Sequence, residues 1–154
     1  MKLIRTAIRT RLQPRGAAAL ETAFVLPVTL LVVFALLDLG LAALRYNTLV
    51  DASQRLAREA AMHGDLAPSV AGSWGPATYT GTAADADEIM NPIRQHLPTM
   101  AADLVAVELT WPDTGNSPRD RIEVGLRYQH QPLLPVFPWG TLDLQSTTTM
   151  RIVN

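Results

Sequence analysis

The chain has 154 residues, 48% of them hydrophobic, no cysteine and a formal net charge of −1. The length allows a membrane segment plus one small domain but not two large domains, and the lack of cysteine excludes disulfides, zinc–thiolate sites and thiol nucleophiles. Once the basic residues 1–15 are set aside, residues 17–154 hold 8 basic and 14 acidic side chains, a net charge of −6 that disfavours binding to nucleic acid.

The first predicted element is a basic leader that ends at Gly16. Five of the 13 basic residues lie before this glycine and none of the 14 acidic ones does. Three alanines and a leucine follow, then Glu21, and then sixteen uncharged residues, 22–37. One acidic residue five positions past a glycine, at the start of a membrane-length apolar run, predicts a cut after Gly16 and a membrane helix that later serves in assembly.

The apolar run that follows is long enough to cross a bilayer. Residues 22–44 contain a single charge, Asp38, and would span about 35 Å as a helix, against a hydrocarbon core of about 30 Å. The basic excess on the N-terminal side predicts that residues 1–16 are cytoplasmic and that the C-terminal domain lies across the membrane. A secretory signal would need a small-residue cleavage site after the run, and residues 44–47 offer none, so we expect the helix to be retained.

Three residues in this apolar run or directly before it differ from the rest. Glu21 has two interpretations. Its negative charge could simply interact favourably with the helix dipole in the first turn, or its carboxylate could pair with the new amine of Ala17 on a neighbouring subunit. The spacing of Glu21 from the glycine favours the second interpretation. Pro27 removes a backbone hydrogen bond and is expected to kink the helix. Asp38 lies about 26 Å beyond Glu21 along a helix, so we expect it near the outer interface, solvated or in a polar contact between packed helices.

Helical spacing continues beyond the membrane run, as far as a stop signal at Gly64. The stripe on one face of residues 45–63 consists of Leu49, Ser53, Leu56 and Ala60. We therefore predict one helix over about 17–63, membrane-embedded first and amphipathic later, whose stripe packs on its own domain. Residues 65–81, rich in Gly, Pro and Ser, predict a loop, and Thr82 with Asp85 resembles a capping box that opens a short helix over 83–97.

Three strands are predicted in the last third of the chain. Apolar and polar residues alternate over 104–111, 121–130 and 142–153, which is typical of a half-buried antiparallel sheet. The connection over 131–140 is unusually apolar, and we expect its Pro132–Trp139 segment to cover the sheet edge, to lie against the long helix or to form a subunit contact.

The predicted fold is therefore α+β, with a long N-terminal helix, transmembrane and then amphipathic, packed on a small domain that has a short helix and a three-stranded antiparallel sheet. Its domains are a cytoplasmic leader over 1–16, a transmembrane helix over 17–44, and an outer domain over 45–154 that includes the second half of the long helix.

No pattern in the sequence predicts an enzyme, a metal site or a cofactor site. The three histidines lie on separate elements without metal-ligand spacing and are interpreted as isolated surface residues: His63, His96 and His130. The acids Asp85, Asp87 and Glu88 could offer oxygens to calcium, but the EF-hand pattern is missing and acids in the first turn of a helix explain them. The sequence has no nucleophile elbow, phosphate loop or dinucleotide fingerprint.

Taken together, these segments resemble the TadE-like pseudopilins, which are minor pilins of the bacterial tight-adherence (Tad, or type IVc) pilus system. The resemblance is carried by the run from Arg15 to Pro27, the apolar stretch with Asp38, the pair Tyr46-Asn47, and the Ala- and Arg-rich helix that ends at residues 58–61. The strand, Pro-rich loop and strand over residues 121–154 are similar as well. TadF-type minor pilins share the N-terminal pattern, so the class is better defined than the subtype.

The resemblance implies how the chain is processed and used. A prepilin peptidase would cut between Gly16 and Ala17, and Glu21 corresponds to the acidic residue at the fifth mature position of the family. The mature subunit would sit in the inner membrane with its domain in the periplasm, and would join or prime a pilus for adhesion and biofilm formation. Its partners would be other Tad pilins and minor pilins, the inner-membrane assembly platform and the lipid bilayer.

Two alternatives to a processed pseudopilin stay open at this point. The first is an uncleaved single-pass membrane protein whose periplasmic domain binds a ligand or partner. The second is a membrane-anchored periplasmic enzyme, which would need polar residues clustered in a pocket. Gly16 and Glu21 separate the first alternative from a pseudopilin, because an anchor has no need for an acid five residues past a glycine.

Overall fold

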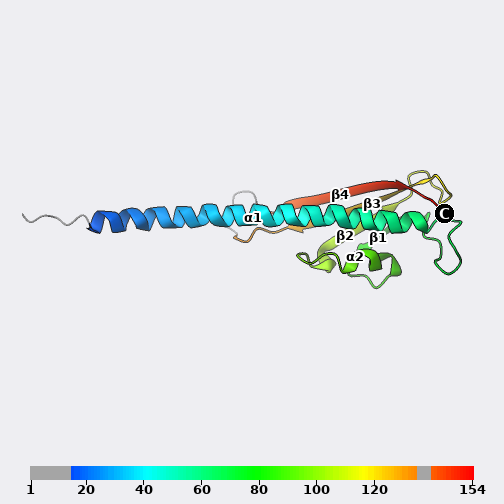
Figure 1. The fold of residues 1–154 in the computed structure, drawn as a ribbon, viewed down its shortest axis with the longest axis horizontal. Coiled ribbons are helices and arrows are strands. Elements are labelled where there is room, and N and C mark those ends of the chain that lie inside the picture. The colour runs from blue at the N-terminus through cyan, green and yellow to red at the C-terminus, as the bar shows by residue number, and fades with distance from the viewer. Residues whose placement is uncertain (1–14, 135–139) are drawn as a thin grey trace, which may run out of the picture. The chain divides into compact units, whose positions relative to one another are not determined.

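One long helix begins the fold. In the computed structural model, which describes residues 15–134 and 140–154, helix α1 extends from Arg15 to Met62 (Figure 1). The predicted helix over 17–63 is therefore confirmed, and α1 continues through Pro27 without a break. The predicted kink at Pro27 stays a prediction, and the predicted leader lies almost entirely outside the described residues.

The chain divides into two compact units within α1. The first ends at Leu36 and the second comprises Leu37–Asn154. In the described part of the first unit every side chain from residue 16 to residue 34 is exposed. The second unit holds the rest of α1 together with every strand among the described residues, and its buried side chains form one hydrophobic core.

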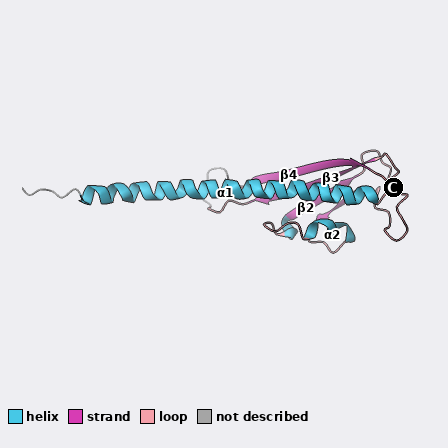
Figure 2. Ribbon diagram, viewed as in Figure 1, coloured by secondary structure: helices cyan, strands magenta, loops and turns pink. Residues whose placement is uncertain are grey.

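The second unit contains a four-stranded antiparallel sheet (Figure 2). The strands lie in the order β1-β2-β3-β4, each paired with its neighbour in the chain. Their bounds are Tyr79–Thr82 for β1, Val105–Thr110 for β2, Arg121–His130 for β3 and Leu142–Arg151 for β4. The α+β class is confirmed, and the three predicted strands correspond to β2, β3 and β4. In β2 and β3 the predicted apolar faces are the buried ones.

The second half of α1 packs on one face of this sheet, alongside β3 and β4 (Figure 1). The stripe predicted from helical spacing is fully buried, because Leu49, Ser53 and Leu56 have no exposed surface and Ala60 is 1% exposed. Alanines beside the stripe let the helix backbone approach the sheet closely. The prediction that the stripe packs on its own domain is confirmed.

A polar contact fixes the level at which α1 meets the sheet. The Ser53 hydroxyl Oγ lies 2.9 Å from both Ser146 Oγ and Thr148 Oγ1 of β4. These hydroxyls satisfy one another in an otherwise apolar layer, where an unpaired hydroxyl would cost free energy. Since Ser146 and Thr148 pair with Leu126 and Val124 of β3, Ser53 lies level with the middle of that strand.

The fourth strand, β1, was missed by the sequence analysis. Residues 65–81 were predicted as a loop, but Tyr79–Thr82 pairs with β2 in the register Tyr79↔Leu109. This strand has only four residues and includes a glycine, so its own sequence carries little strand preference. Its conformation depends on the hydrogen bonds offered by the edge of β2, which no local pattern reveals.

The predicted short helix is present, but it is much shorter than the predicted range 83–97. Only a 3₁₀ turn at Glu88–Met90 (η1) and one helical turn at Asn91–Arg94 (α2) are present, followed by a 3₁₀ turn at Ala102–Leu104 (η2). Thr82 donates its backbone N–H and its hydroxyl to the Asp85 carboxylate, at 2.9 Å each, and this closes a turn rather than opening a helix. Pro92 lies in the first turn of α2, where its missing N–H costs nothing; a longer helix would place it in the interior.

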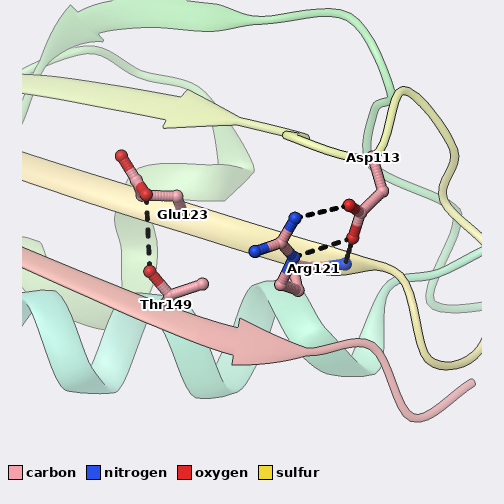
Figure 3. Close-up of polar contacts among 4 residues, drawn as sticks. All are labelled: Asp113, Arg121, Glu123 and Thr149. Carbon is pink, nitrogen blue, oxygen red and sulfur yellow. Dashed lines mark hydrogen bonds and ion pairs between the residues drawn. The ribbon is translucent and has the colours of Figure 1, made fainter.

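A surface ion pair fastens the connection between β2 and β3 (Figure 3). Asp113 accepts hydrogen bonds from the Arg121 backbone N at 2.9 Å, Nε at 3.0 Å and Nη2 at 2.7 Å. These bonds favour the charged carboxylate and lower the pKa of Asp113 to about 2. On the same sheet face the Thr149 hydroxyl donates to Glu123 at 3.4 Å.

Candidate functional site

The residues predicted for processing and assembly all lie on the first unit of α1. Gly16, Ala17 and Glu21 are exposed, and a Cβ built at Gly16 would meet no atom within 4 Å. The backbone between Gly16 and Ala17 belongs to the first turn of α1, because the helix begins at Arg15. Nothing in the described chain covers this turn, so it is open to another molecule.

Glu21 borders a shallow hollow on the surface of α1. The hollow has a volume of about 260 Å³ and is lined by Glu21, Thr22, Val25, Leu26 and Thr29. Both threonine hydroxyls donate to backbone carbonyls one turn earlier, at 2.9 Å. Among the described residues Glu21 makes no hydrogen bond or ion pair, so its carboxylate is free to bind a group from outside the chain.

The surface of α1 around Glu21 is apolar on all sides. Its large exposed side chains include Leu20, Phe24, Val25, Leu30, Phe34 and Leu36. The most hydrophobic window of this helix has a mean hydropathy of 2.5, and only 6% of it is buried. A helix that is apolar all round and covered by nothing is suited to lipid rather than to water. Its length and composition are those of a single membrane span or a signal.

Asp38 stands where the apolar run meets the folded unit. Its side chain has no exposed surface, and its Oδ1 accepts the backbone N–H of Leu133 at 2.8 Å. The same oxygen lies 3.4 Å from His130 Nε2. The expectation that Asp38 is solvated is wrong, because the carboxylate is enclosed by its own domain. The start of the apolar segment Pro132–Trp139 therefore lies against α1, which is one of the three placements expected for it. Residues 135–139 of this segment lie outside the described residues.

Arg45 completes this buried polar group from the helix side. Its Nη1 lies 2.6 Å from His130 Nδ1, and its Nε donates to the carbonyl of Thr99 at 3.0 Å. A guanidinium has only donors, so Nδ1 must accept and the ring proton lies on Nε2, facing Asp38. Arg45 also lies over the Tyr128 ring, 5.4 Å from its centroid. The imidazole of His130 therefore lies between the guanidinium of Arg45 and the carboxylate of Asp38, which is two turns earlier on α1.

The histidines do not gather into a catalytic or metal site. His63 stacks on Trp74 with ring centroids 3.9 Å apart, while His96 is exposed and His130 is buried. The interpretation of all three as surface residues is thus wrong for His63 and His130. Within residues 15–134 and 140–154, no group of three or more His, Asp or Glu side chains could hold a metal ion.

Two of the three acids considered for calcium, Asp85 and Asp87, have partners of their own. Tyr79 donates its hydroxyl to Asp87 at 2.7 Å, and Asp85 lies 3.4 Å from the same oxygen. Burial and the hydrogen bond to Asp87 raise the pKa of Tyr79 to about 12. The hydrogen bonds from Thr82 lower the pKa of Asp85. Asp85 and Asp87 therefore fasten the turn after β1.

Comparison with known proteins finds a family match for one stretch near the N-terminus of the chain. Residues 16–58 match the profile of the TadE-like protein family. The resemblance predicted from the sequence is confirmed over this TadE-like segment, which includes every residue predicted for processing and assembly as well as Asp38 and Arg45. No curated protein and no solved structure gives a significant match to the chain.

The TadE-like segment spans both units of the structure, and its two carboxylates in the apolar run differ in surroundings. Glu21 is exposed, whereas Asp38 is held by Leu133 and His130. The partners of Asp38 were missed by the sequence analysis because they lie 92 and 95 positions away. A charge in an otherwise apolar helix was the one signal, since such a group requires a polar partner.

Proposed function

We propose that this TadE-like chain is a minor pilin, or pseudopilin, which a prepilin peptidase cuts after Gly16 and which then takes part in assembling a Tad (type IVc) adherence pilus. The observation that carries the proposal is the family match over residues 16–58 on an exposed apolar helix whose first turn contains Gly16. The same match supports a structural rather than an enzymatic role, because TadE-like proteins are generally structural.

Glu21 would act after the cut. Removal of residues 1–16 exposes the amine of Ala17 and leaves Glu21 as an uncompensated carboxylate in an apolar helix. An ionised group at the bilayer edge is costly unless it finds a partner of opposite charge. The Ala17 amine of a neighbouring subunit supplies that partner, so pairing would draw subunits together in the membrane.

The membrane segment would end close to Leu37. From Asp38 onward α1 belongs to the folded unit, in which Asp38 and Ala42 are buried. Residues 17–37 would span roughly 31 Å as a helix, which matches the hydrocarbon core of a bilayer. With the basic leader in the cytoplasm, the second unit would lie in the periplasm, attached to the inner membrane until it enters a pilus.

The first test is the N-terminus of the protein purified from its native membrane, by intact mass and terminal sequencing. A start at Ala17 is expected. A start at Met1 would overturn the processing step and favour an uncleaved single-pass protein whose periplasmic domain binds a ligand or partner.

A matched pair of glycine variants shows whether the cut depends on Gly16 itself. Gly16→Val should leave the chain at full length, because a branched side chain replaces the small residue beside the cut. Gly40→Val is the control: it lies in the same helix, and a Cβ there also meets no atom within 4 Å. Normal maturation of Gly16→Val, or equal loss in both variants, would contradict the assignment of the cut.

A further inference from the structure

The outer face of the sheet, opposite α1, carries a hollow. The hollow has a volume of about 340 Å³ and lies over the middle of β2 and β3. Its lining includes two small residues of the outer face, Ala106 and Gly125, among threonines and charged side chains. The face is polar and shallow at its centre, and the described chain places nothing over it.

Gly125 is not explained by the packing of its own chain. It lies in the middle of the ten-residue strand β3, where glycine weakens a strand relative to other residues. A Cβ built there would meet only the Glu108 backbone oxygen at 3.9 Å and Cβ at 4.0 Å, which are ordinary contacts. Glycine inside a strand often marks the close approach of another molecule, and here the approach would be from outside.

Three charges border the hollow in a fixed order. Glu123 and Arg127 lie two residues before and after Gly125 on the same face of β3, and Glu108 of β2 is paired with Gly125. From the start of β3 to its end, the hollow therefore presents first the acid Glu123, then the acid Glu108 beside Gly125, and then the base Arg127.

A stripe of charges on α1 has the complementary order. Asp51, Arg55 and Arg58 are exposed. Their spacing of four and three residues places them on one side of the helix, away from the buried stripe. Asp51 and Arg55 are joined by an ion pair of 2.7 Å whose side chains are about half exposed. From its start outward, the α1 charge stripe (Asp51, Arg55 and Arg58) presents an acid and then two bases.

The two surfaces match in level because α1 and β3 run in opposite directions. Arg45 meets the end of β3 at His130, and Ser53 lies level with Gly125 through its contacts to β4. Consequently Asp51 lies on the Arg127 side of that level and Arg58 on the Glu123 side. A second copy placed beside the first, in the same orientation and without a shift along α1, brings opposite charges to the same level.

We propose that the α1 charge stripe of one copy docks over the Gly125 hollow of the next copy, with Asp51 facing Arg127, Arg55 facing Glu108, and Arg58 facing Glu123. The contact joins two different faces, so it is heterologous and repeats along a row of parallel copies. This docking proposal depends on the proposed function in one respect: both copies must be anchored in the same bilayer. Exposed ion pairs are individually weak, so the contact forms where the membrane has already aligned the helices.

The test is cross-linking of full-length chains in the native membrane, which the absence of cysteine makes clean. Arg58→Cys and Glu123→Cys are combined in one chain and treated with a short bismaleimide. The two positions lie on opposite outer faces of the unit, so a link between them joins different copies. A ladder of dimers, trimers and larger products is expected, while each single variant gives no ladder.

Matched variants separate docking from chance collisions. Arg58→Cys with Asp143→Cys is the control pair, since Asp143 is exposed on the same sheet face but outside the hollow. Adding Gly125→Ile to the original pair should remove most of the ladder without lowering the melting temperature, because the fold has room for a side chain there. Arg127→Glu should reduce the ladder by about fivefold, and the further change Asp51→Arg should restore it.

Two results would overturn the docking proposal: an equal ladder from the control pair, or a ladder that Gly125→Ile leaves intact. The N-terminal mass of the same samples keeps the two proposals apart. A ladder from chains that start at Met1 supports docking and contradicts processing, whereas chains that start at Ala17 without a ladder contradict docking alone.

Discussion

The two halves of α1 have similar backbones and opposite surroundings. From residue 16 to residue 34 every side chain is exposed, although most are apolar. From Leu49 to Ala60 one side of the same helix is buried against the sheet. Helical spacing decides which residues share a face, but only the available partner decides whether that face is buried. The first half has no partner in the described chain, so its apolar surface is left for lipid or another subunit.

The two carboxylates of the apolar run sharpen this contrast. Asp38 is buried and is held by groups of its own domain, whereas Glu21 is exposed and binds nothing in the described chain. A charge placed in an apolar helix needs compensation wherever it lies. The domain compensates Asp38, and the proposed function assigns the compensation of Glu21 to a neighbouring subunit.

The largest expected effect comes from truncating one leucine in each half of α1. Leu56→Ala should destabilise the second unit by about 2–5 kcal/mol, because it removes a fully buried side chain and leaves a cavity. Leu36→Ala should change the unfolding of that unit by less than about 0.5 kcal/mol, because Leu36 is 66% exposed. The measurement is denaturant unfolding in detergent, followed by the fluorescence of Trp74 and Trp111, which are buried in the second unit.

Equal destabilisation by the two leucine variants would break the comparison, since it would show that the first half of α1 is also held by the folded unit. Leu49→Ala tests the same point from a second buried position. It should resemble Leu56→Ala, because both side chains are fully enclosed.

A smaller effect is expected from removing the carboxylates. Asp38→Ala should cost about 1–3 kcal/mol in the unfolding of the second unit, because it removes the acceptor of the Leu133 backbone N–H and the carboxylate that lies 3.4 Å from the buried His130 Nε2. Glu21→Ala should leave that unfolding unchanged and the chain normally cut, yet should impair pilus assembly. Unfolding curves, the N-terminal mass and a count of pili report the three outcomes.

The proposed role of Glu21 would fail if Glu21→Ala cells carried normal pili. The role of Asp38 would fail if Asp38→Ala unfolded like the original chain. A double variant with His130→Ala adds a further check, because residues in one buried group should show non-additive costs.

The parts of the fold that were predictable are those whose signal is periodic. Two periodic patterns predicted the buried faces correctly: the alternation over β2 and β3, and the 3.6-residue spacing of Leu49, Ser53, Leu56 and Ala60. An element that buries one side places apolar residues at the period of its own backbone, so the buried side can be recognised from the sequence. The charge step at Gly16 likewise led to the segment that the TadE-like match covers.

The parts that were not predictable depend on distant residues. β1 is a strand because the edge of β2 pairs with it, and His130 is buried because Asp38 and Arg45 of α1 meet it at the end of β3. The bounds of the short helix were wrong for a different reason. The bonds between Thr82 and Asp85 that define a capping box can also close a turn, and the sequence does not distinguish the two.

The smallest expected effect is a dependence on acid that belongs to the second unit. Hydrogen bonds from Arg121 hold the pKa of Asp113 at about 2, below its ordinary value of 3.8. The folded chain therefore keeps this carboxylate charged at a pH where the unfolded chain protonates it. The resulting stabilisation is complete above pH about 4 and is lost as the pH falls from about 4 to about 2.

Asp113→Asn should flatten this acid dependence without abolishing it, because hydrogen bonds from Arg55 and from Thr82 also lower the pKa of Asp51 and Asp85. The measurement is the melting temperature of the second unit between pH 6 and pH 2, with Asp143→Asn as the exposed control. The change should be modest, because Asp113 lies at the surface, where water and salt screen the pair. If Asp113→Asn kept the original slope, the ion pair would only orient the β2–β3 connection, and acid stability would have to come from the other two carboxylates.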